Sequence, residues 1–313
     1  MADYRRIDVL MKRFQNSKKT LTLSCTLLAG LFLLSVFTST ASSAATSEQS
    51  KKIQKFFSGT NQEVTVYTIH GENSGPTLLI FAGIHGDERA CPIVAAKYSH
   101  IKLKKGTLII VPRLNTIANQ KKKRYGPGGD MNRLFDQPEN SKNPDMKVVN
   151  MARELIKKAD YVVNVHQGDG FYSPTWVDSR RNPSRWGQSN VIDAPNFDLP
   201  NGEKLELEKF AERVAQKTNV KIKDAKFHFQ VNNTNTGSEN TIHKEQRKSL
   251  TYYAITKAHK VAIALEATKN CTPAQATSFL MTAINAVIEE TGIIADKLPS
   301  ENQPPPGKKH RKS

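Results

Sequence analysis

The chain alternates between two kinds of hydrophobic pattern. Short runs dominated by apolar residues predict buried strands, and longer stretches with apolar residues three or four positions apart predict helices that pack on one face. The predicted strands are residues 63–69, 77–82, 107–111, 161–165 and 260–265. The predicted helices are residues 88–100, 143–159, 203–218 and 272–290. Strands alternating with helices indicate an α/β fold, with a mixed, mostly parallel central sheet and helices on both faces.

Three polar stretches interrupt this alternation. Residues 120–130 are basic and rich in Gly, and residues 167–200 carry no sustained hydrophobic pattern, so we expect both stretches to be loops. Residues 227–253 are rich in Asn, Thr and Lys. We expect this third stretch to form a wall that faces a substrate cleft.

The first part of the chain has the pattern of an export signal. Residues 1–20 are basic, residues 21–37 carry no charge, and a stretch of small residues follows. This order predicts an export signal over residues 1–45, with cleavage near Ala44 or Ala45. The alternative is an uncleaved signal that stays as a single membrane anchor, and the rest of the chain is exported in either case.

The remainder divides into a folded part and a short tail. We expect one folded domain over residues 46–299 and a disordered basic tail over residues 300–313, which begins near a run of prolines. Outside the export signal the chain has two cysteines, Cys91 and Cys271. They could form one disulfide in an oxidising compartment, but two cysteines are no disulfide framework, so the core must hold the domain together.

The net charge of the chain indicates which class of partner it binds. The chain has 46 Lys and Arg against 29 Asp and Glu, a formal charge of +17. Four net charges lie in residues 1–20 and three in residues 301–313, so ten belong to the folded part. No nucleic-acid-binding motif accompanies this charge, so we expect no nucleic acid as partner. An anionic partner outside the cytoplasm fits both the charge and the export signal.

Metal-capable side chains follow three of the predicted strands. His85 and Glu88 come after residues 77–82, His166 comes after residues 161–165, and Glu266 ends the last strand. In parallel sheets, strand ends meet at the edge where ligands bind. Two imidazoles and one carboxylate, with a fourth position open for water, are typical of catalytic zinc. The alternatives are an ordinary surface turn for His85 and Glu88, and a buried ion pair for Glu266.

Glu266, Arg124 in the basic loop, and two residues just after that loop complete the candidate chemistry. A carboxylate at the end of an apolar strand is costly without a role, and a general base is such a role. Arg124, Asn132 and Arg133 stand where they could bind a carboxylate or stabilise a developing oxyanion. Three lysines precede Arg124 at residues 121–123, and for these a solvated basic loop is the simpler interpretation.

These motifs resemble the zinc carboxypeptidase superfamily, whose members share a His-x-x-Glu…His pattern. The matching segments are residues 83–88 (GIHGDE), 130–135 (DMNRLF), His166 and Glu266. Residues 111–115 (VPRLN) together with Asn132 and Arg133 are similar to the aspartoacylase/succinylglutamate desuccinylase branch. Residues 166–175 (HQGDGFYSPT) and 181–189 (RNPSRWGQS) are similar to the peptidoglycan DL-carboxypeptidases that control helical cell shape.

The resemblance implies a set of roles and a zinc carboxypeptidase-like catalytic domain. One Zn²⁺ ion would be held by His85, Glu88 and His166, and Glu266 would be the general base. Asn132 and Arg133 would bind the terminal carboxylate of the substrate, and Arg124 would act on the scissile carbonyl. In the cell-shape group the first metal ligand can be Gln, so the His at this position is a departure from that group.

Together these observations predict an exported, periplasmic zinc metallocarboxypeptidase that trims peptidoglycan stem peptides. The expected reaction releases terminal meso-diaminopimelate from muramyl tripeptide. One alternative is an N-acyl amino acid deacylase of the aspartoacylase/succinylglutamate desuccinylase type, and another is an inactive module that binds the cell wall. Contact with a membrane is expected only through an uncleaved signal.

Overall fold

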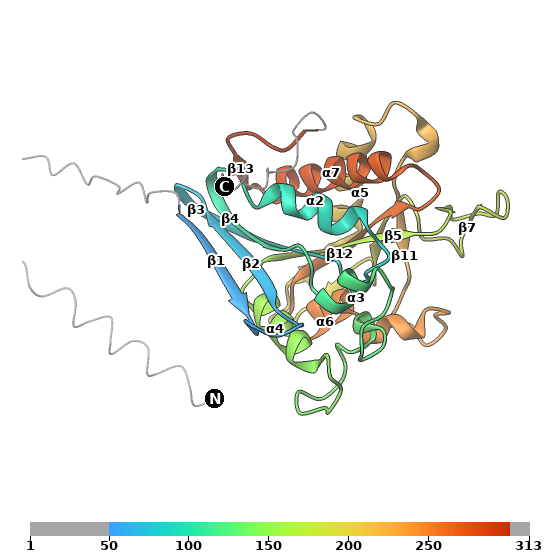
Figure 1. Ribbon diagram of the computed structural model, residues 1–313. Helices are drawn as coiled ribbons and strands as arrows, with labels where there is room; N and C mark the ends of the chain where they lie inside the picture. The colour runs from blue at the N-terminus through green and yellow to red at the C-terminus, as the bar shows by residue number, and fades with distance from the viewer. Residues whose placement is uncertain (1–49, 301–313) are drawn as a thin grey trace, which may run out of the picture. The chain divides into compact units, whose positions relative to one another are not determined.

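A nine-stranded mixed sheet forms the centre of the domain (Figure 1). The computed structural model describes residues 50–300, so the predicted export signal and the basic tail at residues 301–313 lie outside the described residues. The strands of this sheet are β1 (Ser50–Phe56), β2 (Val64–His70), β3 (Asn73–Ala82), β4 (Leu103–Val111), β5 (Tyr161–Gly168), β8 (Ser189–Ile192), β11 (Gln230–Asn233), β12 (Val261–Thr268) and β13 (Ile294–Ala295). Two small sheets pair β6 (Phe171–Tyr172) with β7 (Arg181–Asn182) and β9 (Phe197–Asp198) with β10 (Lys204–Leu205).

The order of the strands places the predicted site at one edge. The sheet runs β1-β2-β4-β3-β5-β12-β8-β11, and the four strands from β4 to β12 are parallel to one another. Antiparallel pairing is found on both sides of this centre, at β1-β2, β2-β4 and β12-β8. The carboxyl ends of β3, β5 and β12 therefore lie side by side, which is the edge where a parallel sheet presents its ligands.

Helices cover both faces of the sheet, and the predicted α/β fold is thereby confirmed. The α-helices are α2 (Ala90–Tyr98), α3 (Thr116–Lys121), α4 (Met146–Lys157), α5 (Leu207–Asn219), α6 (Leu250–Thr256) and α7 (Pro273–Glu290). The 3₁₀-helices are η1 (Met131–Arg133), η2 (Ala225–Phe227) and η3 (Lys244–Lys248). In Figure 1, α2, α5 and α7 lie on one face, and α3, α4 and α6 lie on the other.

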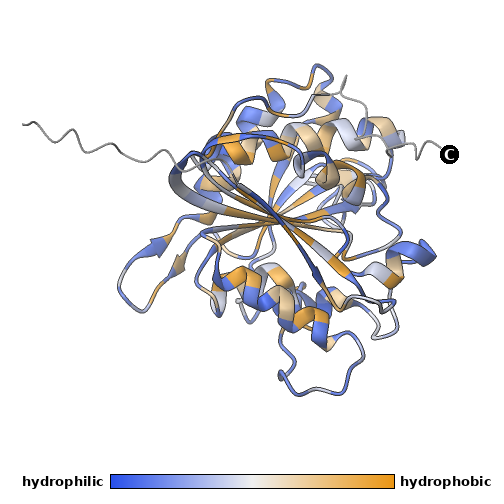
Figure 2. Ribbon diagram, turned by 60° about the vertical axis from the view of Figure 1, so that its left-hand side comes forward, coloured by the Kyte–Doolittle hydropathy of each residue, from blue (hydrophilic) through white to orange (hydrophobic). Residues whose placement is uncertain are grey.

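The hydrophobic core lies between these layers. Figure 2 shows apolar residues concentrated along the central strands and on the helix faces turned toward them. Helix α7 starts from a capping box between Thr272 and Gln275, with Pro273 in the first helical position, and this fixes where its apolar face meets the sheet. The Tyr98 hydroxyl joins α2 to α7 by donating to the Met281 carbonyl over 2.9 Å.

Two polar segments are more ordered than the sequence predicts. The prediction of a loop over residues 167–200 is wrong for residues 189–192, which form strand β8 of the main sheet. Asn190 in this strand is buried and donates from Nδ2 to the Ala211 carbonyl at 3.0 Å, which satisfies the amide donor, while its Oδ1 has no hydrogen-bond partner among the described residues. Helix α6 in residues 227–253 was also not predicted, because its seven residues are too few to show a helical period.

The two cysteines are unbonded. Cys91 is buried in α2, and the Cys271 thiol donates to the Thr268 carbonyl. Among residues 50–300, no helix is long and apolar enough to cross a membrane.

Candidate metal centre and substrate pocket

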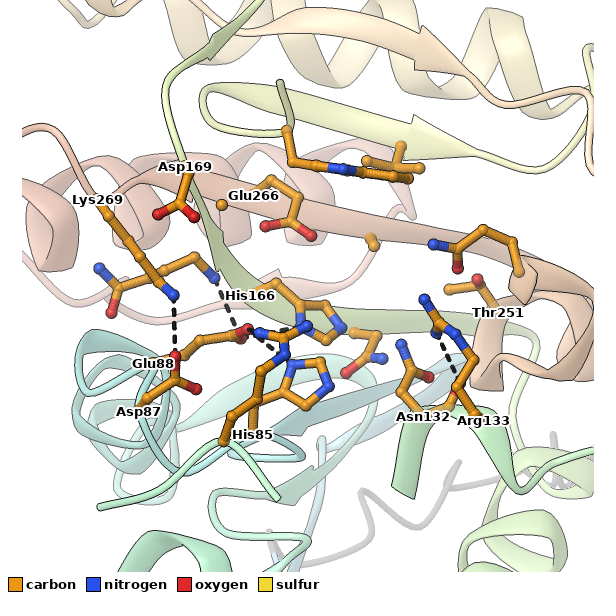
Figure 3. A pocket seen from close by; sticks show the side chains of 18 residues that line it. His85, Asp87, Glu88, Asn132, Arg133, His166, Asp169, Thr251, Glu266 and Lys269 are labelled. Carbon is orange, nitrogen blue, oxygen red and sulfur yellow. Dashed lines mark hydrogen bonds and ion pairs between the residues drawn. The ribbon is translucent and has the colours of Figure 1, made fainter. Parts of the chain in front are cut away.

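His85, Glu88 and His166 form a compact cluster at the carboxyl ends of β3 and β5 (Figure 3). One potential ligand atom from each residue lies within 4.8 Å of the other two. His85 Nδ1 is 2.7 Å from Glu88 Oε1, and His166 Nδ1 is 2.9 Å from Glu88 Oε2. All three side chains are buried, with at most 3 % of each residue exposed. The sequence therefore identified three residues that the fold brings together.

The turn after β3 explains how His85 and Glu88 reach the same point. Gly83 has a φ of +64°, which a residue with a side chain rarely adopts, and it reverses the chain directly after the strand. At Gly86 a methyl group would overlap the Ala118 carbonyl, so only glycine allows the turn to pack against α3. His166 comes from β5, the neighbour of β3, and needs no special turn.

The charges within the cluster compensate one another. Burial alone would raise the pKa of Glu88, but the imidazoles of His166 and His85 outweigh burial and hold that pKa well below its usual range. The Arg124 guanidinium also donates to Glu88 Oε1 over 2.9 Å. The carboxylate is thus ionised and ready to bind a cation.

Asp130 is a functional candidate that the sequence analysis did not single out. Its Oδ1 lies 3.0 Å from His85 Nε2, while the other ring nitrogen of His85 faces Glu88. A carboxylate on the outer nitrogen fixes the orientation of a metal-binding imidazole and raises its basicity. The signal was present, because Asp130 opens the same four-residue motif as Asn132 and Arg133.

The donor set fits a metal ion. Two imidazole nitrogens and one carboxylate oxygen are a combination that zinc favours, and Asp130 supplies the outer partner that such sites usually have. The cluster also opens on a cavity of about 390 Å³, so the metal-facing side is accessible to a substrate. His85, Glu88 and His166 are therefore the residues that could hold a metal here.

Glu266 lies beside this cluster on β12. It is paired in register with His166 on the adjacent strand, so its side chain points from the same face of the sheet. Burial raises the pKa of Glu266 well above its usual range, and the neighbouring charge of Glu88 raises it further. Its Oε2 atom is buried without a hydrogen-bond partner among the described residues. A carboxylate in this state is suited to accept a proton.

The other three predicted residues also line the cavity. Asn132 and Arg133 come from η1, and Arg124 comes from the loop before it. Asn132 Oδ1 accepts the backbone N–H of Leu250, which fixes its amide. The Arg133 guanidinium bonds the Asn132 carbonyl at 2.9 Å and lies at the end of the pocket away from the metal cluster (Figure 3). By contrast, Lys121, Lys122 and Lys123 are exposed and outside the lining.

Several further residues of the pocket were missed by the sequence analysis. Asp87 and Lys269 form an ion pair of 2.9 Å at the end of the pocket opposite Arg133, where Asp169 also lies (Figure 3). Thr251 lies at the Arg133 end (Figure 3), and Gln246 also lines the pocket. Both belong to residues 227–253, so the expectation that this segment faces the cleft agrees with their position.

The fold is that of the zinc carboxypeptidase superfamily, a class of hydrolytic enzymes. A family model described as the catalytic part of carboxypeptidases controlling helical cell shape matches residues 57–298. This match covers most of the chain, and the chain belongs to that family.

Solved structures of one member of this class resemble the chain. The cell shape determinant protein Csd4 from Helicobacter pylori, bound to tripeptide, superimposes with a TM-score of 0.66 at 27 % identity, covering 80 % of this chain and 58 % of that one. The mDAP-bound form of the same protein, described as a D,L-carboxypeptidase, gives a TM-score of 0.65 at 30 % identity and covers 72 % of this chain and 54 % of that one. The chain thus spans little more than half the length of these structures.

Two more distant similarities lie in the deacylase branch. A succinylglutamate desuccinylase/aspartoacylase from Rhodobacter sphaeroides shares the fold, with a TM-score of 0.53 at 17 % identity, and the match covers 82 % of this chain and 70 % of that one. The N-alpha-acetyl-L-2,4-diaminobutyric acid deacetylase of Halomonas elongata is 32 % identical over 107 residues, which cover 32 % of this chain and 31 % of that protein.

Proposed function

We propose that the protein is an exported zinc-dependent carboxypeptidase that trims peptidoglycan stem peptides and releases terminal meso-diaminopimelate from muramyl tripeptide. The observation that carries this proposal is the set of side chains that line one cavity. The cluster of His85, Glu88 and His166, the carboxylate of Glu266 and the guanidinium of Arg133 all line it. Membership in the cell-shape carboxypeptidase family, and relatives described as bound to tripeptide and to mDAP, support the choice of substrate.

The residues of the pocket have separate roles in the proposed hydrolysis. A zinc ion bound by the His85, Glu88 and His166 cluster would supply a Lewis acid for the scissile carbonyl and the attacking water. Glu266 takes the proton of that water and passes it to the leaving amine, a task that its raised pKa favours. Arg133, with the Nδ2 donor of Asn132, binds the terminal carboxylate.

Arg124 has a position consistent with a role at the reacting carbonyl. In this structure it donates to Glu88 Oε1, so its guanidinium already lies at the edge of the metal cluster. It is also partly exposed, with 40 % of its side chain accessible, and can therefore turn toward a bound substrate. An Arg in this place would stabilise the negative charge that develops on the carbonyl oxygen.

Export to the periplasm is part of the proposal. It is supported by the basic, apolar and small-residue segments in residues 1–45. Wall peptides are anionic and lie outside the cytoplasm, so a basic exported enzyme would meet them at an increased rate.

A small-molecule deacylase is the second candidate. It is favoured by the local similarity to the diaminobutyric acid deacetylase, whose substrate is also an acylated diamino acid. The same metal cluster and base could cut an acyl amide, so the pocket chemistry alone suits either substrate.

The deciding experiment offers both substrates to the purified protein loaded with zinc. Muramyl tripeptide and an N-acetyl diamino acid are incubated separately, with and without 1,10-phenanthroline, and the products are identified by mass spectrometry. We expect release of diaminopimelate from the tripeptide, loss of this activity with the chelator, and recovery when zinc is restored. Cleavage of the acetylated amino acid alone would replace the proposal with the deacylase.

Two variants control this experiment. Glu266→Gln removes the proposed base and should abolish turnover while the protein still binds zinc. Lys121→Ala changes an exposed residue at the end of α3 and should leave turnover unchanged. Cleavage at the wild-type rate by Glu266→Gln would show that the hydrolysis does not use this pocket as proposed.

A further inference from the structure

Asn164 is a polar side chain in the pocket that the mechanism above does not use. It lies in β5, two residues before His166, and only 1 % of it is exposed. Neither Oδ1 nor Nδ2 has a hydrogen-bond partner among the described residues. A buried amide in this state destabilises a fold, because it has lost its hydrogen bonds to water and gained none in return. Because Asn164 lines the same cavity as His166, the amide is available to a bound substrate.

The register of the sheet places Asn164 beyond the metal cluster. His166 is paired with Glu266, and Asn164 is paired with Ala264 two residues earlier on the same strands. Ala264 is paired in turn with Val191 on β8. Two residues along a strand correspond to about 6.6 Å, so Asn164, Ala264 and Val191 form a row of side chains one step away from the cluster. All three line the cavity, and they form a floor with small apolar groups and one amide.

The pocket has more hydrogen-bonding side chains than are needed to bind the terminal carboxylate of a substrate. Asn132, Arg133 and Thr251 lie together at this end of the pocket, away from Asp169 (Figure 3). Arg133, with the Nδ2 donor of Asn132, is sufficient for the terminal carboxylate of a substrate. The Nδ2 donor and the Oδ1 acceptor of Asn164 are therefore not needed to bind that carboxylate. A leaving residue that satisfies both must itself carry a donor and an acceptor in its side chain.

We propose that Asn164 is a specificity-determining residue that binds a distal amino-carboxylate group in the side chain of the leaving residue. Its Oδ1 accepts a hydrogen bond from the ammonium, and its Nδ2 donates one to the carboxylate. This proposal rests on the proposed function, and it predicts a preference for diaminopimelate over lysine. Lysine offers only the ammonium, and norleucine offers neither group.

The test compares three stem tripeptides that end in meso-diaminopimelate, L-lysine or L-norleucine. Asn164→Leu keeps a similar volume but removes both hydrogen-bonding groups. We expect it to lower kcat/KM for the diaminopimelate peptide by about 100-fold or more, because it removes two hydrogen bonds to charged groups and each contributes about tenfold or more. The norleucine peptide should change by less than about 2-fold, since it makes neither bond.

Asn164→Asp is the second variant and has the same shape. It keeps an acceptor for the ammonium but loses the donor and adds a negative charge. It should therefore weaken turnover of the diaminopimelate peptide and preserve turnover of the lysine peptide. An equal loss on all three peptides in both variants would overturn the proposal, because Asn164 would then act on the shared part of the substrate or on His166. Unchanged selectivity would overturn it as well.

Two measurements separate this proposal from the function itself. Calorimetry with free meso-diaminopimelate should show weaker binding to zinc-loaded Asn164→Leu than to the wild type; equal binding would refute the role of Asn164. Thermal denaturation should find Asn164→Leu at least as stable as the wild type, since an unpartnered amide has been replaced by an apolar group. A destabilised variant would indicate a structural role instead. A wild type that cleaves none of the peptides would refute the proposed function, and the binding measurement would still decide the role of Asn164.

Discussion

Asp193 should make the protein less stable at neutral pH than it is in mild acid. It follows β8, is buried, and accepts a hydrogen bond of 2.6 Å from the Thr236 hydroxyl. Burial raises the pKa of Asp193 to about 6, and the hydroxyls of Thr236 and Thr251, together with the charge of Arg133, offset burial only in part. The carboxylate is thus ionised at pH 7, and its ionisation destabilises the folded state relative to the unfolded state.

The magnitude follows from the two pKa values of Asp193. Its ordinary pKa is 3.8 and its pKa in the fold is about 6, and each pKa unit corresponds to about 1.4 kcal/mol. At pH 7 the ionised group therefore lowers the free energy of unfolding by about 3 kcal/mol. Below pH 3.8 the group is protonated in both states and this loss is absent. The stability contributed by this residue falls as the pH rises from about 4 to about 6.

Asp193→Asn tests this reasoning because asparagine resembles the protonated acid. Urea denaturation followed by circular dichroism should find the variant about 3 kcal/mol more stable than the wild type at pH 7, with a difference that closes near pH 4. Asp198→Asn is the matched control, since Asp198 is 82 % exposed, and it should change stability by less than about 0.5 kcal/mol. A variant less stable than the wild type at pH 7 would refute the argument, because pairing with Arg133 would then outweigh burial.

Three further substitutions address the site itself. Glu266→Gln should lower kcat by about 10²- to 10⁴-fold with little effect on KM, as measured with muramyl tripeptide, because the proton acceptor is lost; a normal kcat would exclude Glu266 as the base. Asp130→Asn should weaken zinc binding by about 10- to 100-fold in competition with a chromogenic chelator, since His85 loses its orienting carboxylate; unchanged affinity would contradict that role. Arg133→Lys should raise KM by about 10-fold for a free terminal carboxylate but not for the amidated peptide; an equal rise for both would contradict the carboxylate clamp.

The residues at the strand ends could be predicted because their placement depends on a simple rule. His85, Glu88, His166 and Glu266 each follow a strong apolar run, and parallel strands bring such positions to one edge. The prediction needed only the location of the strands, and β3, β5 and β12 were all found by their hydrophobicity. The chemistry of the residue types then suggested their task without knowledge of any distance.

Asn164 and Asp193 could not be found in this way. Asn164 stands inside a strand where hydrophobicity predicts only burial, and its significance is that both amide atoms lack partners. Asp193 follows β8, a strand that the sequence did not reveal because it contains the polar Asn190, whose Nδ2 donates to a carbonyl of α5 inside the fold. Missing partners and distant partners are both properties of the folded chain, so no local pattern encodes them.

The position of the charged residues also changes the meaning of the net charge of +17. The cavity itself is not basic, because its lining holds four carboxylates and three cationic side chains apart from histidine. The excess of Lys and Arg must therefore lie outside the pocket, where water and salt screen each charge. Surface charge of this kind increases the rate of encounter with an anionic wall and contributes little to the choice of substrate. Under the proposed function, selection of the substrate would depend on polar groups inside the cavity. The residues that carry these groups are Arg133, Asn132, Thr251, Gln246 and Asn164.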